Sequence, residues 1–245
     1  MYSRLFNAIF VHIPKTGGQS VEHVFAGLHN LDWRKRGSLL LRKNPRSGQK
    51  PRYLAHLLAS EYYEKGFMAP DVFASCFKFT TVRNPFDRAL SEYRYRSRKR
   101  ELSFSNFVRL ITGSKIDRHL LPQVEFVVDA SGKIMVDRAM RFESLEREFL
   151  EISLELFGRE VPLPHVNKSP PSTGHTDLSE EVRSAIYRRY ERDFDYFGYP
   201  VGREYHFCNS TQGASGESPT DHSQAPHITE GLVADISTES NSRRD

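Results

Sequence analysis

The sequence predicts an α/β fold in which a central parallel sheet is flanked by helices. Two segments read in order as an apolar strand, a turn and an amphipathic helix. Strands that are joined through helices pair in parallel, because the helix carries the chain back along the sheet. With 245 residues, of which 38% are hydrophobic, the chain is long enough for one sizeable domain and too short for two full ones.

The first unit begins near the N-terminus. Residues 7–13 are apolar and β-branched, and the strand should stop at Pro14, which cannot donate to a ladder. Gly17 and Gly18 then permit a tight turn. A helix is predicted after the turn from the i, i+3, i+4, i+7 spacing of Val21, Val24, Phe25 and Leu28.

The second unit repeats this order. Residues 72–82 read as a strand that stops at Arg83. Asn84 suits an N-cap, Pro85 suits the first helical position, and Asp87 in the first turn complements the helix dipole. Farther on we predict a hairpin over 125–137, a helix over 145–156 that ends at Gly158, and a last helix opened by Ser179.

Composition indicates one folded domain followed by a tail. We expect the domain to cover 1–207, with a basic mobile insertion at 34–52 that contains glycine and proline. Residues 208–245 are polar and without periodicity, which predicts a disordered tail. Basic residues gather in two clusters that attract anions: Arg34, Lys35, Arg36, Arg42, Lys43, Arg46, Lys50 and Arg52, and then Arg94, Arg96, Arg98, Lys99 and Arg100.

Several classes of protein are disfavoured. No stretch approaches the roughly 20 apolar residues of a membrane span, and the short apolar run near the N-terminus does not read as a signal peptide, so a soluble, cytoplasmic protein is expected. The cysteines, Cys76 and Cys208, are not expected to form a disulfide framework. The histidines lack metal-ligand spacing, so we expect no metal.

The turn between the first strand and its helix is a candidate phosphate site. In His12–Ser20 (HIPKTGGQS) backbone N–H groups and a helix N-terminus converge, and Lys15 adds a positive charge. The lysine precedes the glycines, which differs from a Walker A loop and disfavours an ATPase. A plain strand-to-helix turn with a solvated lysine is the alternative. Arg83 at the second strand end and Ser91, eight residues on, suit one phosphate monoester. A surface arginine and an unrelated helix serine are the alternative for this pair.

These two motifs resemble a known family. HIPKTGGQS resembles the 5′-phosphosulfate loop, and TVRNPFDRALSEYRY the 3′-phosphate motif, of carbohydrate sulfotransferases that use 3′-phosphoadenosine-5′-phosphosulfate (PAPS). The similarity is to the group that includes heparan sulfate 2-O-sulfotransferase and bacterial relatives. It runs from about Ile9 to Tyr199 through HLLPQ at 119–123, VDRAMRFESL at 136–145 and PHVNKS at 164–169.

The resemblance implies a P-loop-like three-layer fold, PAPS as cosubstrate and its product PAP, the desulfated nucleotide. It assigns residues to the nucleotide as follows: Lys15, Thr16, Gly17, Gly18 and Ser20 to the 5′-phosphosulfate, Arg83 and Ser91 to the 3′-phosphate, and Asn167 and Lys168 to its vicinity. Gln19 departs from the Thr or Ser usual at its position, although its amide can replace the missing hydroxyl donor.

The resemblance also implies a histidine base before the second strand, for which His56 is the candidate beside the catalytic Lys15. His12 is the rival base. His119 and Gln123 are expected to contact the acceptor, with helix capping as the alternative for His119, and Arg141 and Glu143 are expected to form a structural ion pair or cap.

We therefore predict in-line sulfuryl transfer from PAPS to a hydroxyl, with an anionic carbohydrate as the expected acceptor and no nucleic-acid partner. Small alcohols, lipids and peptides remain alternative acceptors. Two other functions remain open: an ATP-dependent small-molecule kinase, and a non-enzymatic polyanion-binding protein that works through the basic clusters alone.

Overall fold

The structure is a computed structural model that describes residues 1–46, 51–98, 101–114, 117–164 and 178–201. These residues belong to the unit Met1–Phe207. Asn167, Lys168 and the expected tail at 208–245 lie outside the described residues.

A mostly parallel sheet of four strands forms the centre of this unit. In spatial order the strands are β1 (Tyr2–Ser3), β2 (Ala8–Val11), β3 (Phe77–Val82) and β4 (Arg138–Arg141). β1 is antiparallel to β2, whereas β2–β3 and β3–β4 are parallel. The predicted parallel pairing of the two strand–turn–helix units is confirmed.

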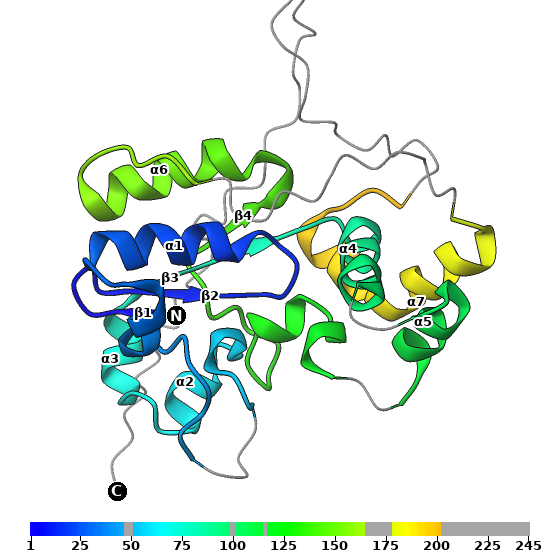
Figure 1. Cartoon of the computed structure of the whole chain (residues 1–245), viewed down its shortest axis with the longest axis horizontal. Coiled ribbons are helices and arrows are strands. Elements are labelled where there is room, and N and C mark those ends of the chain that lie inside the picture. The colour runs from blue at the N-terminus through cyan, green and yellow to red at the C-terminus, as the bar shows by residue number, and fades with distance from the viewer. Residues whose placement is uncertain (47–50, 99–100, 115–116, 165–177, 202–245) are drawn as a thin grey trace, which may run out of the picture. The chain divides into compact units, whose positions relative to one another are not determined.

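Helices cover both faces of the sheet (Figure 1). The α-helices are α1 (Gly18–Leu28), α2 (Glu61–Glu64), α3 (Pro70–Ser75), α4 (Pro85–Ser97), α5 (Phe104–Thr112), α6 (Leu145–Phe157) and α7 (Glu180–Phe197). The short 3₁₀ helices are η1 (Trp33–Leu39), η2 (Leu54–His56), η3 (Arg118–Leu120), η4 (Val124–Phe126) and η5 (Phe142–Ser144). In Figure 1, α1 and α6 lie together over one face, and α4, α5 and α7 form a second group.

Strand alternation divides the core into two layers. Ala8 and Phe10 pack with α1 and α6 residues such as Phe25, whereas Ile9 and Val11 pack with the cluster that includes residues of α4, α5 and α7. Successive side chains of a strand point to opposite faces, so one short apolar strand is buried on both sides. The predicted three-layer α/β architecture is therefore confirmed.

Local signals at the helix ends act as predicted. The Asn84 side chain accepts the Phe86 N–H at 2.9 Å and Pro85 opens α4. α6 ends at Gly158, which adopts the left-handed conformation with φ of 67°. Ser179 occupies the N-cap position of α7, so the predicted start of this helix is confirmed, but its side chain makes no capping hydrogen bond.

Two predicted elements differ from the structure. Residues 72–82 are not one strand: Pro70 opens α3, whose Phe73 is buried, and β3 starts only at Phe77. The hairpin over 125–137 is confirmed only around its turn, where Val128 and Ile134 form an antiparallel bridge and the Met135 N–H donates to the Val127 carbonyl at 2.7 Å. Its first arm is shorter than predicted, because η4 occupies Val124–Phe126. The sequence patterns also predict no strand at β4, which pairs with β3. Its sequence, Arg-Ala-Met-Arg, contains no apolar run, and Met140 is its one buried residue.

The described part of the basic segment 34–52 contains ordered contacts. Leu39 and Leu41 are buried in the core layer that contains α1. The backbones of Lys43 and Tyr53 form an isolated antiparallel β-bridge. Trp33, at the start of η1, stacks on His23 of α1 with 3.8 Å between ring centroids. The mobility of this segment stays a prediction.

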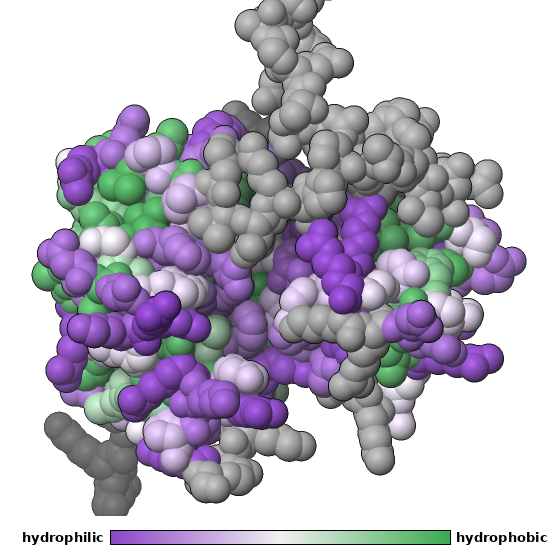
Figure 2. Space-filling view, in the orientation of Figure 1, coloured by the Kyte–Doolittle hydropathy of each residue, from purple (hydrophilic) through white to green (hydrophobic). Residues whose placement is uncertain are grey.

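The described residues contain no helix with the length and apolarity that crossing a bilayer demands. Strongly hydrophilic side chains gather over α4 on the face that Figure 2 shows.

The close packing of α1 against β2 gives a test of the fold. A Cβ at Gly18 would lie 2.3 Å from Cδ2 of the His12 ring, whereas a Cβ at Gly27 would meet nothing within 4 Å. We expect Gly18→Ala to lower the free energy of unfolding by about 1–3 kcal/mol. The control Gly27→Ala, in the same helix, should leave it unchanged or raise it by up to about 1 kcal/mol. Urea denaturation measures both; equal stability of the two variants would contradict this packing.

Candidate active site

The ends of β2 and β3 bring the two predicted phosphate motifs together. β2 and β3 pair in parallel, from Ala8 with Phe77 to Val11 with Thr80, so their carboxyl ends lie at one edge of the sheet. The Arg83 guanidinium donates to the Lys15 carbonyl oxygen at 3.4 Å through Nη1. The arginine of the second motif thus lies against the lysine turn of the first.

Two features shape the lysine turn: left-handed backbone conformations and a hydrogen bond from the Thr16 side chain. Lys15 and Gly17 both adopt positive φ, 71° and 83°. The Thr16 hydroxyl is buried and donates to the Ile13 carbonyl at 2.8 Å, so its proton is used within the turn. Ser20 is half-buried and Gln19 exposed in the first turn of α1, where helix N–H groups lack intrahelical acceptors and the dipole favours an anion.

The absence of a side chain at Gly17 lets the lysine turn pack closely against Phe142, whose ring lies under the Arg83 guanidinium. A Cβ at Gly17 would lie 2.9 Å from Leu145 and 3.0 Å from the Phe142 ring. The same Phe142 ring lies under the Arg83 guanidinium, 4.1 Å from its centroid. A side chain at position 17 would therefore displace the ring on which Arg83 rests.

Lys15 also reaches α4. Its ammonium lies 4.5 Å from the centroid of the Tyr95 ring. Tyr95 follows Ser91 by one helical turn, and residues at this spacing share one face of a helix. Ser91 is half-buried. The structure therefore brings Lys15, Arg83 and the Ser91 face of α4 into one region.

His56 stands beside this region with a defined hydrogen-bond pattern. Its Nδ1 lies 3.0 Å from the His12 carbonyl oxygen, which can only accept, so Nδ1 carries the proton and Nε2 is the accepting nitrogen. Arg118 donates to the His56 carbonyl at 3.0 Å and to both carboxylate oxygens of Glu61. The ring of His56 is therefore fixed by the His12 carbonyl, and its backbone is fixed by Arg118.

Burial lowers the pKa of His56 well below its ordinary value, and the neighbouring His12 and His119 rings lower it further. The hydrogen bond to the His12 carbonyl opposes this shift only in part. The lowered pKa keeps His56 as a neutral imidazole near neutral pH, with an unprotonated Nε2, which is the form that can accept a proton. The lowered pKa also makes the ring a weaker base than an ordinary histidine.

Three histidine rings form a row. The His56 centroid lies 4.5 Å from that of His12 and 5.1 Å from that of His119. His12 is 5% exposed and its Nδ1 lies 2.5 Å from Glu22, so this rival base belongs to the core. His119 is half-buried and its Nδ1 lies 3.2 Å from Glu92.

Gln123 is buried against the backbone of Arg83 and is not exposed as an acceptor contact would be. Its side chain is 0% exposed, and its amide bonds to both the N–H and the carbonyl of Arg83 at 2.8 Å.

Glu143 accepts the Asn84 N–H at 2.8 Å and so supports the start of α4. Arg141 donates to the Phe197 carbonyl, which ties β4 to the end of α7.

Sequence reasoning missed Arg88, which connects the parts of the site. Arg88 is 2% exposed; its Nε donates to the Pro14 carbonyl at 3.1 Å and its Nη2 to the His119 carbonyl at 3.0 Å. It fixes the residue before Lys15 relative to the segment that carries His119. No sequence signal distinguishes this buried arginine from the more accessible arginines around it, such as Arg94 and Arg98, apart from its place one turn after the N-cap Asn84.

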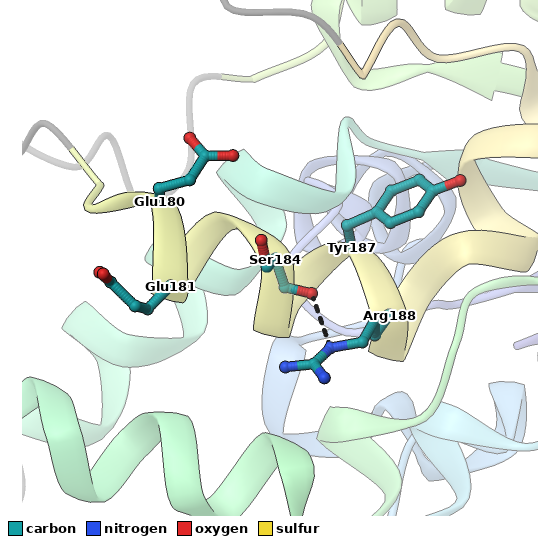
Figure 3. A pocket seen from close by; sticks show the side chains of 5 residues that line it. All are labelled: Glu180, Glu181, Ser184, Tyr187 and Arg188. Atoms are coloured by element: carbon teal, nitrogen blue, oxygen red, sulfur yellow. Dashed lines mark hydrogen bonds between the residues drawn. The ribbon is translucent and has the colours of Figure 1, made fainter.

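Other candidate sites are absent from the described part of the chain or lie elsewhere. Among the described residues no group of three His, Cys, Asp or Glu side chains could hold a metal ion. The open hollow in Figure 3 lies along α7, and no predicted site residue is part of its lining, which consists of Glu180, Glu181, Ser184, Tyr187 and Arg188.

A parallel sheet with a lysine turn and an arginine at neighbouring strand ends is typical of α/β proteins that bind phosphorylated ligands. The model of a family described as the sulfotransferase family matches residues 2–200. Because this match covers most of the chain, the protein belongs to the sulfotransferase family and is a transferase of sulfuryl groups. Comparisons with curated proteins and with solved structures gave no match. The similarity to the heparan sulfate 2-O group stays a prediction.

The environment of His56 predicts its titration. A lowered pKa keeps the ring neutral at pH values where an ordinary histidine, with a pKa of about 6.5, is half protonated. We expect ¹⁵N NMR of histidine-labelled protein to show His56 neutral at pH 6.5, protonated at Nδ1, and charged only at lower pH. His56→Gln assigns the signal. A midpoint at or above 6.5 would contradict the described environment.

Proposed function

We propose that the protein transfers the sulfuryl group of PAPS to a hydroxyl of a carbohydrate. The observation that carries the proposal is the contact between the Arg83 guanidinium and the Lys15 carbonyl, at 3.4 Å. It supports one nucleotide held at both ends, with the 5′-phosphosulfate at the lysine turn and the 3′-phosphate at Arg83.

The donor set suits the two anionic groups of PAPS. Lys15, the N–H groups at the start of α1 and Ser20 would hold the 5′-phosphosulfate, and Gln19 would add an amide donor. Arg83 and Ser91 would hold the 3′-phosphate. Thr16, with its hydroxyl bonded to Ile13, would contribute through its backbone. Asn167 and Lys168 complete the proposed nucleotide set from outside the described residues.

His56 would act as the base. Its Nε2 accepts the proton of the acceptor hydroxyl while the hydroxyl oxygen forms a bond to sulfur, and the bond from sulfur to the 5′-phosphate oxygen breaks. PAP leaves with the electron pair of that bond. Lys15 and the N–H groups of the turn stabilise the negative charge that grows on the leaving phosphate. The proposed reaction needs no metal.

An anionic carbohydrate is the proposed acceptor. Exposed basic side chains, including Arg42, Lys43 and Arg52, extend from the segment that leads into His56. Such side chains attract carboxylate and sulfate groups of a polysaccharide. His119, half-buried beside the His56 ring, is the proposed acceptor contact nearest to the base.

Ligand-induced thermal shifts test the function. A ligand that binds only the folded state raises the melting temperature. We expect PAP to raise it without magnesium and more than ATP with magnesium does. Sulfated products from a panel of hydroxylated glycans, detected by mass spectrometry with PAPS as donor, would identify the acceptor. A shift only with ATP and magnesium would favour a kinase, and a salt-sensitive shift only with heparin would favour a polyanion-binding protein.

Substitutions of the two catalytic candidates should act differently. Lys15→Ala should reduce turnover by at least about 10²–10³-fold, because it removes a charge that stabilises the leaving phosphate. His56→Ala should lower kcat by about 10²–10⁴-fold with little change in PAP affinity. Single-turnover assays and calorimetric titration with PAP measure these effects, with Lys133→Ala, an exposed lysine that has no proposed role in the site, as the control. Full activity in both variants would overturn the mechanism.

A further inference from the structure

The backbone of Arg83 is held by a side chain where the strand ladder ends. The paired residues of β3 end at Val82, which is opposite Arg141 of β4. One residue farther, Gln123 Oε1 accepts the Arg83 N–H and Gln123 Nε2 donates to the Arg83 carbonyl, each at 2.8 Å. Two residues of antiparallel strands exchange the same pair of bonds. Gln123 therefore extends the hydrogen bonding of β3 to the residue that bears the guanidinium.

Gln123 is itself fixed from α7. The Asp193 carboxylate is fully buried and accepts the N–H groups of Gln123 and Val124 at 2.8 and 2.9 Å. The Gln123 side chain is 0% exposed. Its backbone and its amide are thus both anchored, so the position of Arg83 is determined by a chain of buried contacts that begins on α7.

The neighbouring atoms restrain the same residue from other directions. The N–H of Asn84 donates to Glu143, and the Phe142 ring lies under the Arg83 guanidinium. These contacts fix where the arginine side chain starts and which face of its guanidinium is covered. The amide of Gln123 is the contact that holds both polar atoms of the Arg83 backbone.

We infer that Gln123 is a positioning residue that fixes the backbone of Arg83 so that its guanidinium meets the 3′-phosphate of the nucleotide. This inference rests on the proposed function, since it takes Arg83 as the ligand of that phosphate. It replaces the sequence-based expectation that Gln123 contacts the acceptor, because a side chain without exposed surface does not reach a sugar.

The test is the preference for PAP over adenosine 5′-phosphate, which lacks the 3′-phosphate. Calorimetric titration of the full chain gives both dissociation constants, and their ratio measures the grip on that phosphate. We expect Arg83→Met to remove the preference and Gln123→Met to reduce it by about tenfold, comparable to the loss of one charge-assisted hydrogen bond. In an Arg83→Met background, Gln123→Met should change the ratio no further, because it acts through the arginine.

Two further variants separate positioning from general loosening of the fold. Gln123→Glu keeps an acceptor for the Arg83 N–H and loses the donor to its carbonyl, so it should reduce the preference and carries the test if Gln123→Met does not fold. Val127→Ala truncates a fully buried side chain of the same region that makes no described contact with Arg83. It should lower the melting temperature and leave the ratio unchanged.

Four results would overturn the inference. A parallel weakening of both nucleotides in Gln123→Met would mean a general structural role. If Gln123→Met left the ratio of the two nucleotide dissociation constants unchanged and raised the KM for the acceptor, Gln123 would be an acceptor-site residue. A wild-type protein without preference for PAP would remove the 3′-phosphate assignment and this inference together, whereas a preference lost in Arg83→Met and kept in both Gln123 variants would remove this inference alone.

Discussion

The parallel pairing of β2 with β3 is the constraint on which the site depends. Strands that run in the same direction end at the same edge of a sheet, and here that edge receives the lysine turn from one strand and Arg83 from the next. Under the proposed function, neither segment alone would hold a nucleotide that carries phosphates at two positions. The register between the strands sets the distance between the two motifs, and the apolar residues that bury β2 on both faces fix that register.

Beyond the last ladder pair, buried side chains supply the hydrogen bonds that strands would otherwise supply. Gln123 bonds to the backbone of Arg83, and Arg88 donates to the carbonyls of Pro14 and His119. Asp193 accepts the N–H groups of Gln123 and Val124. A buried backbone polar group without a partner is costly, so this network is required once the chain leaves the sheet. It also explains why a site made of turns is held in one arrangement.

Sequence patterns predicted the parts of the structure that depend on local chemistry. The two strand–turn–helix units, the cap at Asn84 and the helix stop at Gly158 follow from residue type and spacing. Patterns failed where tertiary contacts decide the outcome: β4 has little apolar character, and residues 72–75 join a helix that Pro70 begins. The convergence of the two motifs was predictable from a parallel sheet. The roles of Arg88 and Gln123 were not, because a polar side chain is recognised as buried only when its partners, distant in sequence, are known.

The stack of Trp33 on His23 gives the protein an intrinsic optical reporter. The chain contains one tryptophan, so its emission arises from a single location. The His23 ring on which it stacks also bonds through Nδ1 to the carbonyl of Gln19, in the first turn of α1. The indole is therefore linked through one imidazole to the helix start that follows the lysine turn. Its fluorescence can be followed without a dye or an engineered label, in the same solution in which turnover is measured.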